Sequence, residues 1–353
     1  MVIKRFVVLI VVGVFVLGAV GVFAQEEGSD DPLQEIHDDT MTVVIDGHLH
    51  TTREILKIMD NSNLVYELGI LPEDTVLGEE EPQSLRQPYE CHMEGDEVVV
   101  GPAELSDTVM QLIKMGDSVF QAKDYKAALE LYREALALDS GSSVVWTMVG
   151  DGFFFLEQYD SAETAFKKAI ELNYIDYDAH WFLCDVYRKQ GDDLRGLEEL
   201  TIAHILNPNH ETLKRTLVSR REAVGQPWRD WEFRPEYVLS SDGHRVSVRA
   251  KENWLGYAMA KAVWRYEPGY HQKMTGEESS TSSITLQEER ECLAQLLLNP
   301  EPDQEVVEPL GDGYIDQFVF YEIWRKKYPL SLLKMPDIEE KVGRIVEYIN
   351  KYH

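Results

Sequence analysis

The sequence predicts a mainly α-helical protein, in which a solenoid of helical hairpins is preceded by a small acidic α+β region and followed by a mainly helical domain. Residues 109–210 repeat with a period of 34, which is typical of stacked helical hairpins. Hydrophobic residues make up 44% of the 353 residues, enough to bury a core. We therefore divide the chain into four parts: an export signal at 1–24, a partly disordered acidic region at 25–104, a repeat array with a capping helix at 105–224, and a helical domain at 225–353.

The first 24 residues have the pattern of a secretory signal peptide. Lys4 and Arg5 precede an uninterrupted apolar run of 18 residues, and Val22-Phe23-Ala24 offers a small-x-small cleavage pattern. We expect cleavage after Ala24 and an exported protein, either periplasmic or secreted. The alternative is an uncleaved anchor, since 18 apolar residues can just span a bilayer. We expect contact with a membrane only in that case, and only through this segment.

Acidic residues dominate the segment before the repeats. Residues 25–108 contain 22 acidic and 3 basic side chains, and the whole chain has a formal charge of −29. We interpret the start of this segment as disordered and solvated, or alternatively as an arm that masks the arginines of residues 220–234. The acidic balance argues against binding to a nucleic-acid backbone, so we expect no nucleic-acid partner. Short elements are predicted as strands at Thr42–Ile45 and Val98–Val100 and as a helix at Thr52–Met59.

A histidine motif, Asp46-Gly47-His48-Leu49-His50, resembles the first metal-binding strand of metal-dependent amidohydrolases. That family needs a barrel of about 250 residues, whereas only about 50 residues separate this motif from the repeats. We therefore expect a turn with exposed histidines instead of a metal site. The sequence also lacks nucleophile-elbow, phosphate-loop, zinc-protease and Cys-x-x-Cys motifs. We expect a non-catalytic protein that needs no cofactor.

The repeat positions follow a fixed spacing of 34 residues. Small side chains recur at three positions and large apolar side chains at three others: Gly116, Gly150 and Cys184; Ala128, Ala162 and Gly196; Ala135, Ala169 and Ala203; Tyr132, Phe166 and Leu200; Met115, Val149 and Leu183; Val119, Phe153 and Tyr187. This pattern resembles the tetratricopeptide repeat (TPR), with local departures at His180, Ser140 and Tyr174. The resemblance implies three hairpins in a right-handed superhelix, with the first helix of each hairpin on the concave side. Residues 211–224 have helical spacing and many polar side chains, which is typical of a capping helix.

The TPR resemblance also implies a binding groove along the first helices. In that family, the groove is lined by residues one position away from the packing seam. Here a carboxylate recurs at Asp117, Asp151 and Asp185 beside large aromatic side chains, and Asp178 lies on the same face. The residues that we expect to contact a ligand are Lys114, Asp117, Phe120, Met148, Asp151, Phe154, Phe155, Trp181, Phe182, Asp185 and Arg188.

The charge of this groove predicts the kind of partner. In this family, a clamp that captures a C-terminal carboxylate uses Asn where this chain has Asp, and three carboxylates would repel such a ligand. We therefore expect an exported scaffold that binds a protein or peptide segment of apolar or basic character. The alternative for the groove is that the chain's own N- or C-terminal part covers its aromatic side chains.

Residues 225–353 match no family pattern that we recognise. Capping boxes and apolar periodicity predict helices from Thr285 and from Asp337. The stretch from Trp228 to Trp264 is rich in tryptophan, which leads to a second hypothesis: the repeats brace a C-terminal domain that binds a small molecule or glycan.

The sequence contains three cysteines, and we expect one of them to be buried and the other two to be able to form a disulfide. Cys184 occupies the small position of the seam and should be buried. Cys91 and Cys292 remain as the two that can pair in an oxidising compartment.

Overall fold

The computed structural model describes residues 50–77, 85, 88–94, 97–276, 285–298, 303–325, 329–335 and 337–353. These residues form two compact units. One contains residues up to Glu79 together with Glu232–Val319, and the other contains Glu80–Trp231 together with Phe320–His353. The predicted export signal, the strand at Thr42–Ile45 and His48 lie outside the described residues.

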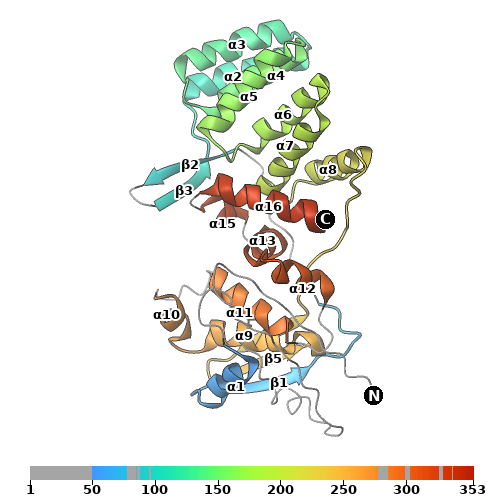
Figure 1. Ribbon diagram of the computed structural model, residues 1–353. Coiled ribbons are helices and arrows are strands. Elements are labelled where there is room, and N and C mark those ends of the chain that lie inside the picture. The colour runs from blue at the N-terminus through green and yellow to red at the C-terminus, as the bar shows by residue number, and fades with distance from the viewer. Residues whose placement is uncertain are drawn as a thin grey trace. The chain divides into compact units, whose positions relative to one another are not determined.

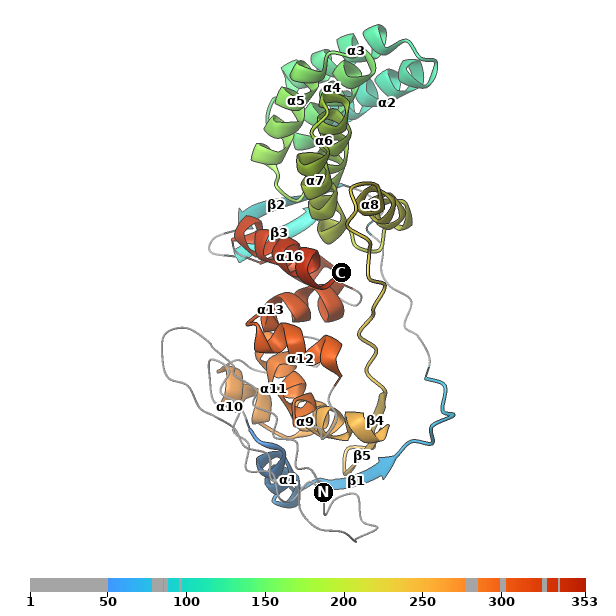
Figure 2. The same ribbon diagram turned by 45° about the vertical axis from the view of Figure 1, so that its right-hand side comes forward.

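The repeat array is a run of consecutive helices, each packed against the next (Figures 1 and 2). Three helical hairpins are followed by one further helix, so the predicted solenoid of helical hairpins with a capping helix is confirmed. The helices are α2 (Asp107–Gln121), α3 (Tyr125–Leu138), α4 (Ser143–Phe155), α5 (Tyr159–Leu172), α6 (Tyr177–Gln190), α7 (Asp193–Leu206) and α8 (Glu211–Ala223).

Local sequence explains where these helices begin. The side chains of Ser106, Asp124, Ser142, Asp176 and Asp192 each accept a hydrogen bond from the backbone N–H three residues later. Each bond satisfies a donor that the first helical turn would otherwise leave free. The helix starts are therefore encoded locally, by residues that recur close to the 34-residue period.

Glycines at the seam allow the two helices of a hairpin to approach closely. A Cβ atom added at Gly116 would collide with the ring of Tyr132, and one at Gly150 would collide with the ring of Phe166. Both rings are buried. The repeating small residue is therefore a packing requirement of the hairpin.

Gly150→Ala is expected to lower the free energy of unfolding of the array by about 1–3 kcal/mol, because the Phe166 ring must leave its position. Urea unfolding followed by far-UV circular dichroism measures the change. Gly141→Ala is the matched control, since the nearest heavy atom to its added Cβ is Asp139 Oδ1 at 3.6 Å. Equal stability of the two variants would contradict this account of the seam.

Elements from outside the array complete the same unit. The hairpin of β2 (Tyr89–Glu94) and β3 (Glu97–Pro102) lies beside the last helix α16 (Ile338–Tyr352) in Figures 1 and 2. Asn173 Nδ2 donates to the carbonyl of Tyr89 at 2.8 Å, which ties the hairpin to the end of α5. The helices α15 (Pro329–Leu333) and α16 pack against α7.

The other unit is a small sheet with helices. Its strand order is β1-β5-β4, with β1 parallel and β4 antiparallel to β5. Helix α9 packs against β5, α1 and α11. The strands are β1 (Val65–Ile70), β4 (Tyr237–Ser241) and β5 (Arg245–Ala250), and the helices are α1 (Thr52–Asp60), α9 (Leu255–Tyr266), α10 (Tyr270–Thr275), α11 (Leu286–Leu296), α12 (Gln304–Gly311) and α13 (Ile315–Phe318).

The structure divides the chain differently from the boundaries expected at residues 104 and 224. Strand β1 comes from the acidic N-terminal region but pairs with β5, so the two regions expected to be separate share one sheet. At the other end, α16 belongs with the array because it packs on α7. Within these units the helix expected from Thr52 and the strand expected at Val98–Val100 are both present.

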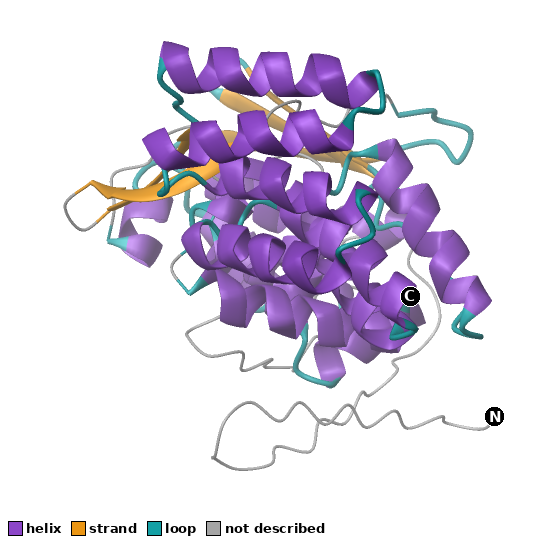
Figure 3. Ribbon diagram, turned by 90° about the horizontal axis from the view of Figure 1, so that it is seen from above, coloured by secondary structure: helices purple, strands orange, loops and turns teal. Residues whose placement is uncertain are grey.

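Helices make up most of the described chain, and its strands lie in one three-stranded sheet and one hairpin (Figure 3). No helix in this part of the chain has both the length and the apolar character needed to cross a membrane. All three cysteines are free: Cys91 is exposed, whereas Cys184 and Cys292 are buried. The burial of Cys184 agrees with its seam position. The Cys91–Cys292 pair that the sequence allowed is not formed.

Candidate protein-binding face

The recurring aspartates converge on one face of the array, which we call the carboxylate face: the side of α2, α4 and α6 that carries Asp117, Asp151 and Asp185. Burial and the neighbouring charges of Asp117 and Asp185 raise the pKa of Asp151 to about 7. Burial and the charges of Asp176 and Asp151 raise the pKa of Asp178 to about 7. Residues that are 34 positions apart in sequence thus lie close enough to repel one another.

The carboxylates on this face differ in their partners. Asp117 Oδ1 accepts a hydrogen bond from the Tyr132 hydroxyl at 2.8 Å. Asp185 Oδ1 accepts from Arg188 Nη2 at 3.1 Å. Asp151 has no hydrogen-bond or ion-pair partner within the described part of the chain. It is therefore a half-buried acid without a cation.

The first aromatic cluster borders these carboxylates, and its rings come from α2, α3, α4 and α5. The rings of Phe120, Tyr125 and Phe155 lie within 4.9 to 5.1 Å of one another, and Phe154 joins them at 5.4 Å from Phe155. Tyr159 completes the cluster at 5.7 Å from Phe154. Phe155 remains 44% exposed, so the cluster presents apolar surface to solvent.

The second aromatic cluster lies on α6 and at the start of α8. Trp181 stacks on Phe182 at 6.2 Å and meets the edge of His210 at 5.4 Å. Tyr177 lies 6.2 Å from His210. These side chains are half-buried and combine apolar surface with polar edges.

Several of the residues expected to contact a ligand are only partly exposed, because they also pack against the seams between helices. Met148 and Phe120 pack against the seam around Leu129 and Tyr132. Phe154 and Phe182 pack partly against the seam around Phe166, and Trp181 against the one around Leu200. Lys114 is exposed on α2. The repeat pattern does not predict Tyr125, Tyr159, Tyr177 and His210, because they lie at helix starts, outside the first-helix positions that line the groove in this family.

Repulsion on the carboxylate face predicts a pH-dependent stability. The folded-state pKa of Asp151 lies above the value of about 3.9 for an unfolded aspartate. Between about pH 4 and 7 the folded array therefore binds more protons than the unfolded chain does. Stability therefore falls as pH rises through this range. Asp151→Asn is expected to stabilise the array at pH 8 by about 1–2 kcal/mol, a figure reduced from the full shift because the group is partly solvated.

Urea unfolding at pH 8 and pH 6 measures this effect, and Glu130→Gln on the exposed side of α3 is the charge-matched control. We expect Asp151→Asn to show a smaller difference between the two pH values than the control. A destabilised Asp151→Asn variant at pH 8 would contradict the repulsion. A carboxylate whose removal stabilises the fold is typical of a functional residue.

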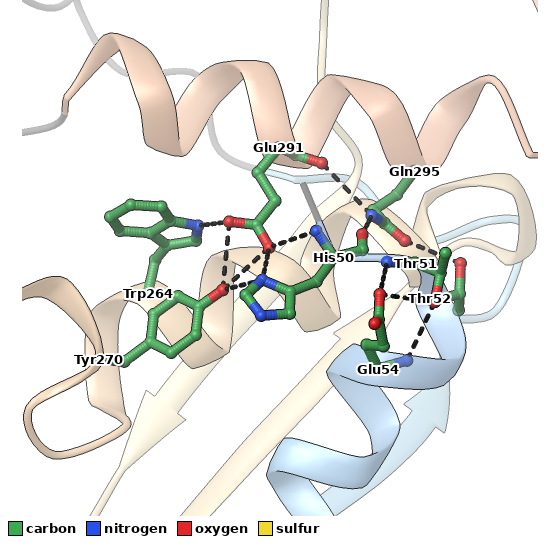
Figure 4. Close-up of polar contacts among 8 residues, drawn as sticks. All are labelled: His50, Thr51, Thr52, Glu54, Trp264, Tyr270, Glu291 and Gln295. Carbon is green, nitrogen blue, oxygen red and sulfur yellow. Dashed lines mark hydrogen bonds and ion pairs between the residues drawn. The ribbon is translucent and has the colours of Figure 1, made fainter. Parts of the chain in front are cut away.

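A buried polar cluster in the other unit tests the second hypothesis (Figure 4). Glu291 is fully buried and accepts hydrogen bonds from Trp264 Nε1 at 2.7 Å and the Tyr270 hydroxyl at 2.9 Å. His50 Nδ1 lies 2.8 Å from Glu291 Oε1. Because Trp264 is buried and bound to an internal carboxylate, it does not line a surface pocket.

The same cluster corrects the expectation for the histidine motif. His50 contacts a buried carboxylate and its carbonyl accepts from Gln295 Nε2 at 2.9 Å, so it is not an exposed turn residue. Among the described residues, no group of three or more His, Cys, Asp and Glu side chains is arranged to hold a metal ion.

Two of the four arginines expected to meet an acidic arm have partners within the described part of the chain, and the arm itself lies outside the described residues. Arg221 is buried, lies over the Trp228 ring and donates to Asn350 Oδ1 at 2.9 Å. Arg234 is paired with Glu232. Burial takes Arg221 out of the basic surface that the sequence predicts, whereas the Arg234 side chain remains exposed.

Comparison with known proteins supports the repeat assignment. Residues 148–203 match the tetratricopeptide repeat family. A curated relative, anaphase-promoting complex subunit 3 of Schizosaccharomyces pombe, is 30% identical over 91 residues, which are 26% of this chain. The chain spans only 14% of that relative's length.

Solved structures also match part of this chain. MamA is 22% identical and matches over 34% of this chain and 70% of its own, with a TM-score of 0.31. The Yersinia enterocolitica chaperone SycD, in complex with a peptide of the translocator YopD, is 20% identical over 34% of this chain and 95% of its own, with a TM-score of 0.32.

Proposed function

Because residues 148–203 match the tetratricopeptide repeat family and helical hairpins stack over α2 to α7, we propose that the chain is an exported, non-catalytic scaffold that holds a segment of another protein against the carboxylate face. Export rests on the signal pattern that ends at Ala24. The observation that carries the binding role is the exposed ring of Phe155 beside Asp151, an acid without a cation among the described residues.

Both features favour a ligand. Exposed aromatic surface next to half-buried polar groups is typical of the residues that dominate protein interfaces. A basic side chain in the ligand would relieve the repulsion between Asp151 and its neighbours, whereas a carboxylate would add to it. The proposed partner segment is therefore apolar or basic.

Burial of the Trp264 side chain gives no support to the second hypothesis, a small-molecule or glycan site along the tryptophan-rich stretch. Trp228 belongs to one unit, and Trp254 and Trp264 to the other. The stretch therefore does not form one continuous part of the fold.

Affinity capture from an extract of the native cell envelope tests the proposal. The bait is residues 25–353, compared with a Phe155→Ala, Trp181→Ala double variant. Leu194→Ala is the control, because Leu194 is an exposed apolar side chain on α7, outside the carboxylate face. Far-UV circular dichroism establishes that all three baits are equally helical.

We expect a protein that is captured by the wild type and by Leu194→Ala but not by the double variant. Equal capture by all three baits would place the interaction elsewhere on the chain and contradict the proposed role of this face.

A further inference from the structure

Carboxylates and aromatic side chains follow one another along α4 and α6. On α4, Phe155 follows Asp151 by four residues, so the two side chains lie one turn apart on the same side of the helix. On α6, Trp181 follows Asp178 by three residues and precedes Asp185 by four. Helices α4 and α6 are in contact, and the charges of Asp151 and Asp178 act on each other.

Helix geometry sets the spacing between these features. Neighbouring packed helices lie about 8–10 Å apart, and residues one turn apart on a helix face are separated by about 6 Å. An extended chain rises about 3.3 Å per residue. A ligand in extended conformation therefore needs about two residues to go from Asp151 to the ring of Phe155, and about three to reach Trp181 on the neighbouring helix.

From this arrangement we infer that the carboxylate face binds an extended segment in which one Lys or Arg is flanked on both sides, within about three residues, by apolar or aromatic side chains. The basic side chain meets Asp151 and Asp178, and the flanking side chains pack on the two aromatic clusters. The inference rests on the proposed function and specifies the chemistry of the segment.

Charge complementarity is what selects this occupant. A purely apolar segment would bury Asp151 further without supplying a counter-charge, which is costly for an ionised carboxylate. A guanidinium or ammonium group supplies that charge, and a guanidinium can also stack on an aromatic ring. Asp185 already contacts a cation, Arg188, whereas Asp178 is hydrogen-bonded by the neutral Tyr177 side chain, so Asp151 and Asp178 are the acids that we assign to the ligand.

Peptide display tests the inference directly. A random 12-residue phage-displayed library is selected against residues 25–353, and in parallel against three variants: Asp151→Asn with Asp178→Asn, Phe155→Ala, and the control Glu130→Gln. We expect the wild type and the control to enrich peptides with one basic residue between two apolar ones. The double Asn variant should lose the preference for the basic residue, and Phe155→Ala should lose the preference on one flank.

A consensus peptide is then synthesised with a fluorescent label, and its affinity is measured by fluorescence polarisation. We expect the double Asn variant to bind it at least tenfold more weakly, with less effect from Glu130→Gln. Enrichment of peptides without a basic residue, but still dependent on Phe155, would overturn the inference and leave the proposed function standing. Selection that gives no enrichment above an unrelated protein would count against both.

Discussion

Removing residues 50–77 is expected to unfold residues 232–298 while the repeat array stays folded. The deleted segment supplies β1, which pairs with β5, and the buried side chains Ile55 and Met59 of α1. It also supplies Thr52, whose hydroxyl donates to the buried Gln295 at 2.7 Å. Without these contacts, β5 loses its parallel neighbour and α9 loses a helix that packs on it.

Hydrogen exchange measured by mass spectrometry on residues 50–353 and on a chain that begins at residue 78 checks this prediction. Peptides from α9 and α11 should exchange rapidly in the shorter chain. Peptides from α4 and α6 are the internal control, because they belong to the other compact unit. Unchanged protection of α9 would show that the C-terminal region folds without the N-terminal strand.

Lys261→Met is expected to destabilise the sheet-containing unit by about 3–5 kcal/mol. Lys261 is buried on α9, and its Nζ lies 2.9 Å from Glu288 Oε1 and 2.5 Å from Glu289 Oε1 on α11. Methionine keeps most of the side-chain volume but removes the charge. Two buried carboxylates then remain next to each other without a cation.

Denaturant unfolding followed by tryptophan fluorescence measures the loss at pH 8 and at pH 5. Burial already raises the pKa of Glu288, and loss of the lysine raises it further. The loss of stability should therefore be smaller at pH 5, where a larger share of this carboxylate is protonated than at pH 8. A triple variant that also carries Glu288→Gln and Glu289→Gln should recover part of the stability. A loss below about 1 kcal/mol at pH 8 would indicate that the ion pairs contribute little.

The repeat array could be predicted from the sequence because its contacts are local. Gly150 meets Phe166 within one hairpin, and the same pair of positions recurs 34 residues away as Gly116 and Tyr132. Periodicity in the sequence therefore reports directly on packing in space. The sequence contains no comparable pattern for the parallel pairing of β1 with β5, because alternating side chains predict a strand but not its partner.

The candidate binding face also combines features that the sequence predicts with features that it does not. The convergence of Asp117, Asp151 and Asp185 followed from the repeat register. The aromatic side chains at helix starts, such as Tyr125 and His210, did not, because their place depends on how one hairpin meets the next. The contact between His50 and Glu291 joins residues 241 positions apart, and no local pattern indicates it.

The pairing of Val65 with Arg245 implies an order of folding, in which the repeat array forms before β1 pairs with β5. During synthesis β1 emerges 180 residues before its partner β5, and the whole repeat array is made in between. Helical hairpins that contact only their neighbours form quickly, whereas a pairing of such long range is slow. We expect the array to be folded while the backbone groups of β1 still lack their partners on β5. In this state the nascent chain is open to non-native strand pairing.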